Sequence, residues 1–296
     1  MKLAISVSGG GVLGIGPLQF MRRLEKDLGQ SLADYGAAFA GTSTGSIVAA
    51  GLCTGLSASE LYDLYRENLS AIFTKVSSAK ILTNNYYRYD NSKLKKLLQK
   101  TFRYKMYEFK KPIYIPATFM NGDSVEKVWD RGDGMTDQWF AVLSSCSAPT
   151  YFEVVSREKN GKTETYCDGG MWASDPIMVL ESGLNQAKEF KGDYKILSFN
   201  TGMVRPNNAP SDKSIVGWGK YILDEWIART GNSGYFQACA NIGEANVCRV
   251  APRVGSKYAM DDLSLVNEVA GIWDELYNQT GKSVLSFVKS TVSAKK

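Results

Sequence analysis

The sequence predicts an α/β fold in which a central, mostly parallel sheet is flanked by helices. Short apolar runs typical of buried strands alternate with longer segments whose apolar residues recur every three or four positions. The first run, residues 2–8, leads directly into consecutive glycines, which predicts a strand that feeds a tight loop. The 296 residues are 44% hydrophobic and 22% charged, as expected of a globular protein.

The elements follow in order from these patterns. After the first strand, residues 17–28 are expected to form a helix, because their leucines and methionine share one face and their charges lie on the other. The pair Asn160-Gly161 between two strand-like runs is a strong hairpin signal. Further strands are expected at residues 37–40, 112–120, 150–156, 162–167 and 195–200. Further helices are expected at residues 46–56, 57–68, 91–100, 137–145, 177–189, 215–229 and 263–277.

No internal repeat, low-complexity segment or clear linker interrupts the chain, so a single domain is expected over residues 1–296. The motifs that carry chemistry fall within residues 2–202. Residues 203–296 are expected to form a mainly helical C-terminal extension. Residues 69–90 mix apolar, polar and tyrosine residues and are interpreted as a lid or a membrane-facing segment.

The cysteine content and the absence of histidine exclude several kinds of site. Five cysteines form no CxxC pair, and without histidine a zinc site is not credible. We therefore expect no metal and a reduced, intracellular compartment. No charged-then-apolar leader and no apolar run of about 18 residues is found, so we expect neither a signal peptide nor a membrane span.

The first chemical motif is the glycine-rich loop SGGGVLG at residues 8–14. Consecutive N–H groups between a strand and a helix can stabilise negative charge, as in an oxyanion hole. Gly9, Gly11 and Gly14 also fit the dinucleotide pattern GxGxxG, and Asp34 lies 20 residues beyond Gly14. Such a match is weak, and a plain glycine turn is a third interpretation.

The second motif is GTSTG at residues 41–45, with Ser43 at its centre. It falls between an expected strand and an expected helix, the context in which a nucleophile elbow has physical meaning. Flanking glycines remove Cβ atoms that would clash in such a strained turn. Most serine hydrolases use histidine as the proton shuttle, so here a carboxylate, a lysine or a water would have to take the proton.

The third motif is DGG at residues 168–170. By itself it fits an ordinary turn. The functional interpretation is a carboxylate, Asp168, that accepts the proton of Ser43 as attack proceeds. Partial burial would raise its pKa and make it a better base.

In this order the three motifs resemble the patatin-like phospholipase family, over about residues 2–202. The resemblance also rests on SAPTYF at residues 147–152 and on Pro176 after the DGG. It implies a three-layer patatin-like fold without metal or cofactor, in which Ser43 is the nucleophile and Asp168 the base. It places Gly9, Gly10 and Gly11 in the oxyanion hole and Gly14, Gly41, Gly45, Gly169 and Gly170 in supporting positions.

Two positions depart from the family pattern. Leu13 stands where the family usually has arginine or lysine, and Ser174 where it commonly has asparagine. Loss of the loop cation would weaken anion stabilisation or alter head-group preference. Neither position belongs to the dyad, so activity is expected to survive.

The resemblance implies a lipid acyl hydrolase that acts through an acyl-enzyme. One alternative is acyl transfer by the same dyad, and another is a membrane-binding scaffold that has lost catalysis. The GxGxxG pattern leaves an NAD-dependent oxidoreductase as a remote third alternative. The implied partners are a phospholipid or other acyl lipid, a peripheral membrane surface and an activator of unknown identity, but no nucleic acid. We expect a cytoplasmic protein with transient membrane association.

Charge distribution suggests where a membrane would bind. The net charge is +5, yet residues 71–111 contain 11 Lys or Arg against two acids. Basic patches suit anionic surfaces, while a solvated helix face explains them equally well. Replacing Lys93, Lys95 and Lys96 with glutamate is predicted to weaken binding to anionic vesicles.

Overall fold

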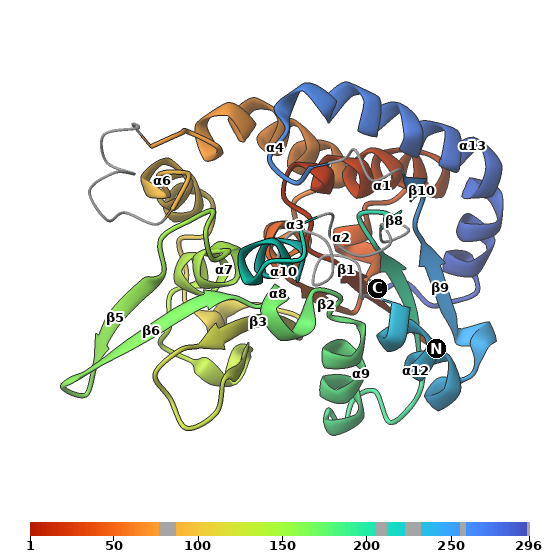
Figure 1. The fold of residues 1–296 in the computed structure, drawn as a ribbon. Coiled ribbons are helices and arrows are strands. Elements are labelled where there is room, and N and C mark those ends of the chain that lie inside the picture. The colour runs from red at the N-terminus through yellow and green to blue at the C-terminus, as the bar shows by residue number, and fades with distance from the viewer. Residues whose placement is uncertain (77–86, 205–211, 223–231, 255–258, 295–296) are drawn as a thin grey trace.

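The computed structural model describes residues 1–76, 87–204, 212–222, 232–254 and 259–294. Within these ranges an eight-stranded sheet runs through the molecule with helices on both faces, which confirms the α/β prediction (Figure 1). Parts of the segment expected to form a lid and of the helix expected at residues 215–229 lie outside the described residues.

The sheet has the order β5-β6-β3-β2-β1-β7-β9, and β4 pairs with β3. Strands β3, β2, β1, β7 and β9 are parallel, whereas β4, β6 and β5 add an antiparallel region. The strands are β1 (Lys2–Val7), β2 (Ala38–Gly41), β3 (Ile113–Phe119), β4 (Glu126–Trp129), β5 (Val155–Lys159), β6 (Lys162–Asp168), β7 (Tyr194–Phe199) and β9 (Val247–Val250). A separate parallel pair joins β8 (Met203–Val204) and β10 (Arg253–Val254).

Helices form a layer on each face of this sheet. Helices α1, α4 and α13 pack together on one face, and α9 and α12 pack together on the other (Figure 1). The helices are α1 (Ile15–Leu28), α2 (Leu32–Tyr35), α3 (Thr44–Thr54), α4 (Ala58–Ile72), α6 (Ser92–Thr101), α7 (Gln138–Cys146), α8 (Gly170–Ala173), α9 (Ile177–Gln186), α10 (Ile215–Tyr221), α12 (Asn232–Ile242) and α13 (Val266–Lys289).

The three-layer arrangement follows from strands that are apolar on both faces. Along β1, Leu3 and Ile5 join the larger hydrophobic core beside α1, whereas Ala4 joins a second core beneath α9. Along β2, Phe39 faces the larger core and Ala38 the second. Continuous apolar runs are typical of strands covered by helices on both sides.

The C-terminal part of the chain is built onto the same sheet. Strand β9 pairs with β7 at its edge, and the 24-residue helix α13 packs along α1. Helix α13 continues 12 residues past the end expected from the sequence, as far as Lys289. Strands β4 and β9 were not expected, because each has only four residues. Helix α12 was not expected either, because its 11 residues lack a clear periodic pattern.

The antiparallel hairpin shows one confirmed prediction and one error. Asn160 and Gly161 both have positive φ, at 51° and 73°, as a tight hairpin turn requires. The strand expected at residues 150–156 instead begins at Val155. Residues before it turn back, because the N–H groups of Tyr151 and Phe152 both donate to the carbonyl of Ala148.

Candidate active site

Ser43 occupies a strained turn between β2 and α3. Its backbone has φ 52° and ψ −129°, a conformation that costs a residue with a Cβ about 1–3 kcal/mol. A Cβ on Gly41 would lie 2.1 Å from the carbonyl oxygen of Gly45, and one on Gly45 would lie 2.2 Å from that of Val7. Both glycines are therefore needed for the turn to form against β1.

The end of helix α7 holds this turn in place. The Ser43 N–H donates to Ser145 Oγ at 2.9 Å, and Cys146 Sγ donates to the Ser43 carbonyl at 3.1 Å. That carbonyl also accepts from the N–H and Oγ of Ser46, at 2.8 and 2.6 Å. The sequence reasoning did not single out Ser145, Cys146 or Ser46. For Ser145 and Cys146 the one signal in the sequence is a cluster of small polar residues at the end of the apolar segment that forms α7.

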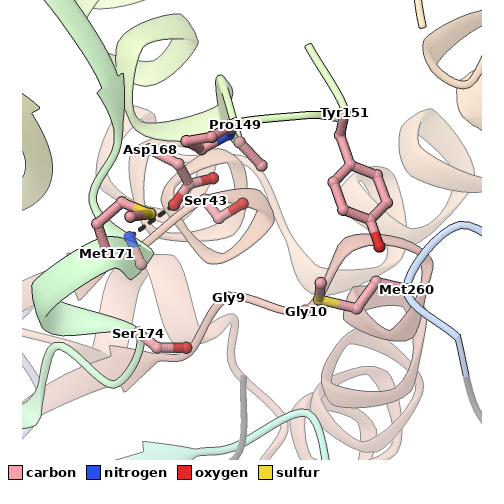
Figure 2. Close-up of a pocket in the computed structure, with 11 residues that line it drawn as sticks. Gly9, Gly10, Ser43, Pro149, Tyr151, Asp168, Met171, Ser174 and Met260 are labelled. Atoms are coloured by element: carbon pink, nitrogen blue, oxygen red, sulfur yellow. Dashed lines mark hydrogen bonds between the residues drawn. The ribbon is translucent and has the colours of Figure 1, made fainter. Parts of the chain in front are cut away.

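Asp168 lies at the end of β6, where strand pairing places it opposite Ala117 of β3. It is 4% exposed, and its Oδ1 accepts the Gly170 N–H at 2.6 Å. Burial raises the pKa of Asp168 to about 7, and the nearby Ser43 hydroxyl and the Gly170 N–H, which both favour the charged form, offset this only partly. The structure thus brings Ser43 and Asp168 together, as Figure 2 shows.

The second carboxylate oxygen of Asp168 is not fully satisfied. Oδ2 is buried and has no partner of ordinary hydrogen-bond geometry among the described residues. The Ser43 hydroxyl therefore affects the pKa of Asp168 from a position that falls short of a full hydrogen bond. Catalytic hydrogen bonds are often loose without substrate, so this geometry is compatible with a nucleophile–base pair.

The glycine loop runs against Ser43. A Cβ on Gly9 would lie 3.0 Å from Ser43 Cβ. The Gly9 N–H already donates to the Ser174 carbonyl at 3.0 Å, so Gly9 offers no free donor here. Among the described residues the N–H groups of Gly10 and Gly11 have no acceptor. Of the three glycines expected in the oxyanion hole, Gly10 and Gly11 therefore have N–H groups that are available to a ligand.

Leu13 and the supporting glycines contribute packing. The Leu13 side chain is apolar and is buried in the larger core, so it packs there and adds no charge to the loop. A Cβ on Gly14 would lie 3.2 Å from Thr44 Oγ1, and one on Gly169 would lie 2.2 Å from the Pro116 carbonyl oxygen. A Cβ on Gly170 would lie 2.9 Å from Asp168 Oδ1. These glycines let the three motifs approach one another closely.

A buried ion pair supports the DGG turn from the C-terminal extension. Arg249 of β9 pairs with Asp175 and donates to Ser198 Oγ at 2.9 Å. The side chains of Arg249 and Asp175 are 7% and 3% exposed. Sequence reasoning missed this pair, because nothing in the local pattern around Arg249 indicates a partner near residue 175.

Two cavities meet at Ser43. The first, of about 590 Å³ including the space at its mouth, is lined by Gly9, Gly10, Asp168, Met171 and Ser174 (Figure 2). The second, of about 480 Å³ measured in the same way, is more apolar and extends toward α4 and α6.

Neither a metal cluster nor a membrane span occurs in the described ranges. No three His, Cys, Asp or Glu side chains there gather as metal ligands would. No helix there is both long and apolar enough to cross a bilayer.

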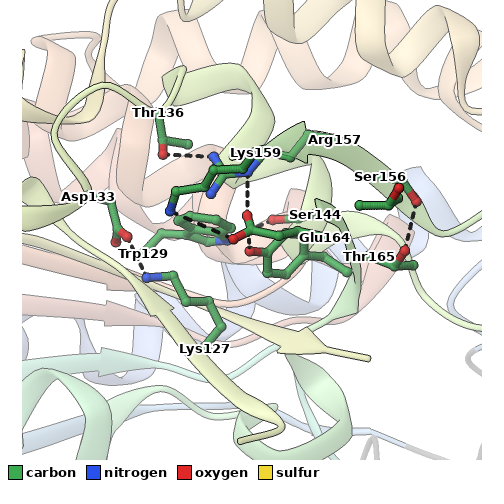
Figure 3. A network of polar contacts seen from close by, with 12 residues as sticks. Lys127, Trp129, Asp133, Thr136, Ser144, Ser156, Arg157, Lys159, Glu164 and Thr165 are labelled. Atoms are coloured by element: carbon green, nitrogen blue, oxygen red, sulfur yellow. Dashed lines mark hydrogen bonds and ion pairs between the residues drawn. The ribbon is translucent and has the colours of Figure 1, made fainter. Parts of the chain in front are cut away.

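A second shielded carboxylate lies on the antiparallel part of the sheet (Figure 3). Glu164 of β6 accepts from Arg157 Nε at 2.7 Å and from the Tyr166 hydroxyl at 2.8 Å. The Arg157 guanidinium also lies over the rings of Trp129 and Phe140. Burial alone would raise the pKa of Glu164, but these hydrogen bonds and neighbouring positive charges leave it lowered.

Comparison with known proteins decides the family. Residues 5–181 match the family model described as patatin-like phospholipase. The chain belongs to this family. The match covers well over half of the chain and includes all three motifs, so the family assignment made from those motifs is confirmed.

Individual patatin-like relatives are distant in sequence. Patatin-like protein 2 from Arabidopsis thaliana is 26% identical over 79% of this chain and 67% of its own length. A cGAMP-activated phospholipase from Pseudomonas aeruginosa is 26% identical over 77% of this chain and 72% of its own length. VipD from Legionella pneumophila, a solved structure, is 13% identical with a TM-score of 0.49, covering 98% of this chain and 67% of its own. Some relatives are much longer, and the chain spans as little as 23% of their length.

Proposed function

We propose that this chain is a lipid acyl hydrolase that cleaves phospholipid or related acyl esters through a Ser43–Asp168 dyad. The observation that carries the proposal is the buried Asp168 carboxylate, which lies beside a serine held in a strained turn and has one oxygen without a partner among the described residues. Perturbed titratable groups and stored backbone strain both concentrate at catalytic sites.

The first half-reaction forms an acyl-enzyme. As Ser43 Oγ bonds to the ester carbonyl carbon, its proton passes to Asp168 and the carbonyl oxygen becomes an oxyanion. The N–H groups of Gly10 and Gly11 donate to that oxyanion. Collapse of the intermediate breaks the ester C–O bond, and Asp168 returns the proton to the leaving oxygen, releasing an alcohol or lysolipid.

The second half-reaction releases the fatty acid. Water attacks the acyl-enzyme while Asp168 accepts one of its protons, and the same glycine N–H groups hold the new oxyanion. The Ser43–acyl bond then breaks and Ser43 recovers its proton from Asp168. A base with a pKa near 7 suits both steps, because about half of it is ionised at neutral pH and it is basic enough to accept a proton.

The lipid substrate is supported by the family and by relatives that carry the name phospholipase. Because phospholipids are found in membranes, we propose that the protein acts at a peripheral membrane surface. Lys93 and Lys96 of α6 line a groove whose opposite wall is acidic, with Glu60 and Asp63 of α4, so part of their charge is offset within the protein.

The deciding experiment is mass spectrometry of products after the purified protein meets mixed phospholipid vesicles, with Ser43→Ala in parallel. Free fatty acid and lysolipid from the wild type alone would support the proposal. Acyl esters of an added competing alcohol would indicate acyl transfer instead. A third arm adds cGAMP, because the name of one relative includes activation by it. Vesicle binding without product in every arm would indicate a silent scaffold and contradict the proposal.

A further inference from the structure

We infer that residues 259–262, in the C-terminal extension, complete the active site, and that Met260 and Tyr151 divide it into an acyl-chain compartment and a leaving-group compartment. This inference rests on the proposed function. It gives a specificity role to a segment that lies outside the matched family region, residues 5–181.

The segment is anchored on the glycine loop by its backbone. The Met260 carbonyl accepts the Val12 N–H at 2.7 Å. A Cβ on Gly11 would lie 2.2 Å from that carbonyl oxygen, and the Gly11 φ of 55° also favours glycine. Gly11 therefore has to be glycine both for its own conformation and for Met260 to approach.

The side chain of Asp261 links this segment to residues 88–89 and, through them, to Tyr151. Asp261 accepts the Tyr89 hydroxyl at 2.8 Å and lies 3.6 Å from the Arg88 guanidinium. The Tyr89 N–H donates to the Tyr151 carbonyl at 2.8 Å, and the Arg88 guanidinium lies 4.8 Å above the Tyr151 ring. Three segments that are remote in sequence thus fix Tyr151 and Met260 relative to one another.

Tyr151 and Met260 stand where the two cavities meet. Both residues line both cavities, together with Ser43 and Ala148. In Figure 2 the Tyr151 hydroxyl points toward Met260, across the cavity from Ser43 and Asp168. Their side chains therefore form a partition whose edge faces the nucleophile.

The chemistry of the walls assigns each compartment. The second cavity is walled by the apolar side chains of Ile47, Ile72, Phe73, Leu94 and Phe152. Such a surface suits an alkyl chain, because the polar side chains in its lining are few: Ser43, Thr44, Cys146 and Tyr151. The first cavity contains Asp168 and Ser174. The leaving oxygen has to lie on that side, because Asp168 returns the proton to it.

The test compares two methionine truncations on opposite sides of Ser43. Met260→Ala removes the partition side chain but keeps the backbone bond to Val12. Met171→Ala makes the same change in the wall of the leaving-group compartment. Met135→Ala, at a position 75% exposed and outside both cavities, is the control. Hydrolysis is measured with p-nitrophenyl esters of four to sixteen carbons, which share one leaving group.

Met260→Ala should change the ratio of kcat/KM for long over short chains by about tenfold, the scale for altered pocket contacts with alkyl groups. Met171→Ala and Met135→Ala should keep the wild-type ratio. An unchanged ratio in Met260→Ala, or an equal change in Met171→Ala, would overturn the inference.

A binding measurement separates this inference from the proposed function. Fatty acids of the same lengths displace a fluorescent fatty-acid probe from Ser43→Ala protein, with and without Met260→Ala. The added substitution should alter the chain-length dependence even though turnover is absent. Failure of the wild type to hydrolyse any ester would contradict the proposed function, whereas an unaltered binding profile would contradict the partition.

Discussion

Asp168 in the candidate site and Glu164 in the hairpin network are carboxylates of the same strand with opposite surroundings. Glu164 has Arg157 and Tyr166 as partners, and its pKa is lowered. Asp168 has a backbone N–H and a loosely placed serine, and its pKa is raised to about 7. Positively charged and hydrogen-bonding partners favour the ionised form of Glu164, whereas burial favours the protonated form of Asp168.

Helix α7 connects the two regions through adjacent buried serines. Ser144 Oγ accepts the Trp129 Nε1–H at 2.8 Å and so belongs to the network. Ser145 Oγ accepts the Ser43 N–H at 2.9 Å and so belongs to the site. Neighbouring residues of one helix thus serve stability and, by our proposal, catalysis.

The largest expected effect is the loss of turnover without loss of folding. Ser43→Ala and Asp168→Asn should each lower kcat by about 10⁴-fold or more, because the nucleophile and its base act as a unit. Their unfolding midpoints should stay close to or above that of the wild type. Hydrolysis assays and thermal denaturation check this, and residual activity near the wild-type level would contradict the dyad.

In the hairpin network around Glu164 we expect the opposite result, a loss of stability without a loss of turnover. Arg157→Met removes one partner of Glu164, which keeps Tyr166 and Lys159, and should lower the free energy of unfolding by about 2 kcal/mol. Adding Glu164→Gln should restore part of that loss, since no unpaired charge then remains. Urea denaturation measures both variants. A large fall in kcat/KM for the folded Arg157→Met enzyme would break the proposed separation of roles.

The pH dependence of activity should report Asp168 alone. As a base it has to be ionised, so kcat/KM should fall about tenfold per pH unit below an apparent pKa near 7 and level off above it. Glu164→Gln should keep this profile. An acid limb centred near pH 4 in the wild type would show that Asp168 is not perturbed as described.

The pH dependence of stability should have opposite signs in the two regions. The pKa of Asp168 is raised on folding from an ordinary 3.8 to about 7, so its charge destabilises the fold increasingly as pH rises through that window. Asp168→Asn should therefore gain about 4 kcal/mol over the wild type between pH 4 and pH 8.

Glu164 shows the reverse, because its pKa is lowered on folding. The stabilisation of the fold by ionised Glu164 is present above about pH 4.5 and is lost as pH falls below that value. Glu164→Gln should thus be less stable than the wild type at pH 7, with the difference shrinking below pH 4. Denaturant titrations across pH test both variants, and shifts of the same sign would contradict the contrast.

The smallest expected effects separate the adjacent serines of α7. Ser145→Ala leaves the Ser43 N–H without its acceptor and should lower kcat/KM about tenfold, equivalent to about 1.4 kcal/mol. Ser144→Ala leaves the Trp129 indole unsatisfied and should cost about 1 kcal/mol of stability at unchanged kcat/KM. Measuring kcat/KM and the free energy of unfolding for both variants tests this prediction. A loss of kcat/KM in Ser144→Ala, or none in Ser145→Ala, would contradict it.

The sequence by itself determined the local chemistry of this protein. It predicted the turn at Ser43, because glycines at 41 and 45 are needed wherever a strand turns so sharply into a helix. It predicted the hairpin at Asn160-Gly161, since few other residues accept positive φ in succession. It also indicated the family, because the motifs occur in a characteristic order.

Only the tertiary structure decided what surrounds those motifs. Strand register sets Asp168 opposite Ala117 and so beside Ser43, and no short-range spacing encodes that register. The Ser145 bond to Ser43 and the Met260 bond to the glycine loop likewise join segments that are remote in sequence. Local patterns report backbone conformation and burial, whereas proximity between distant residues depends on how the sheet and its helices pack.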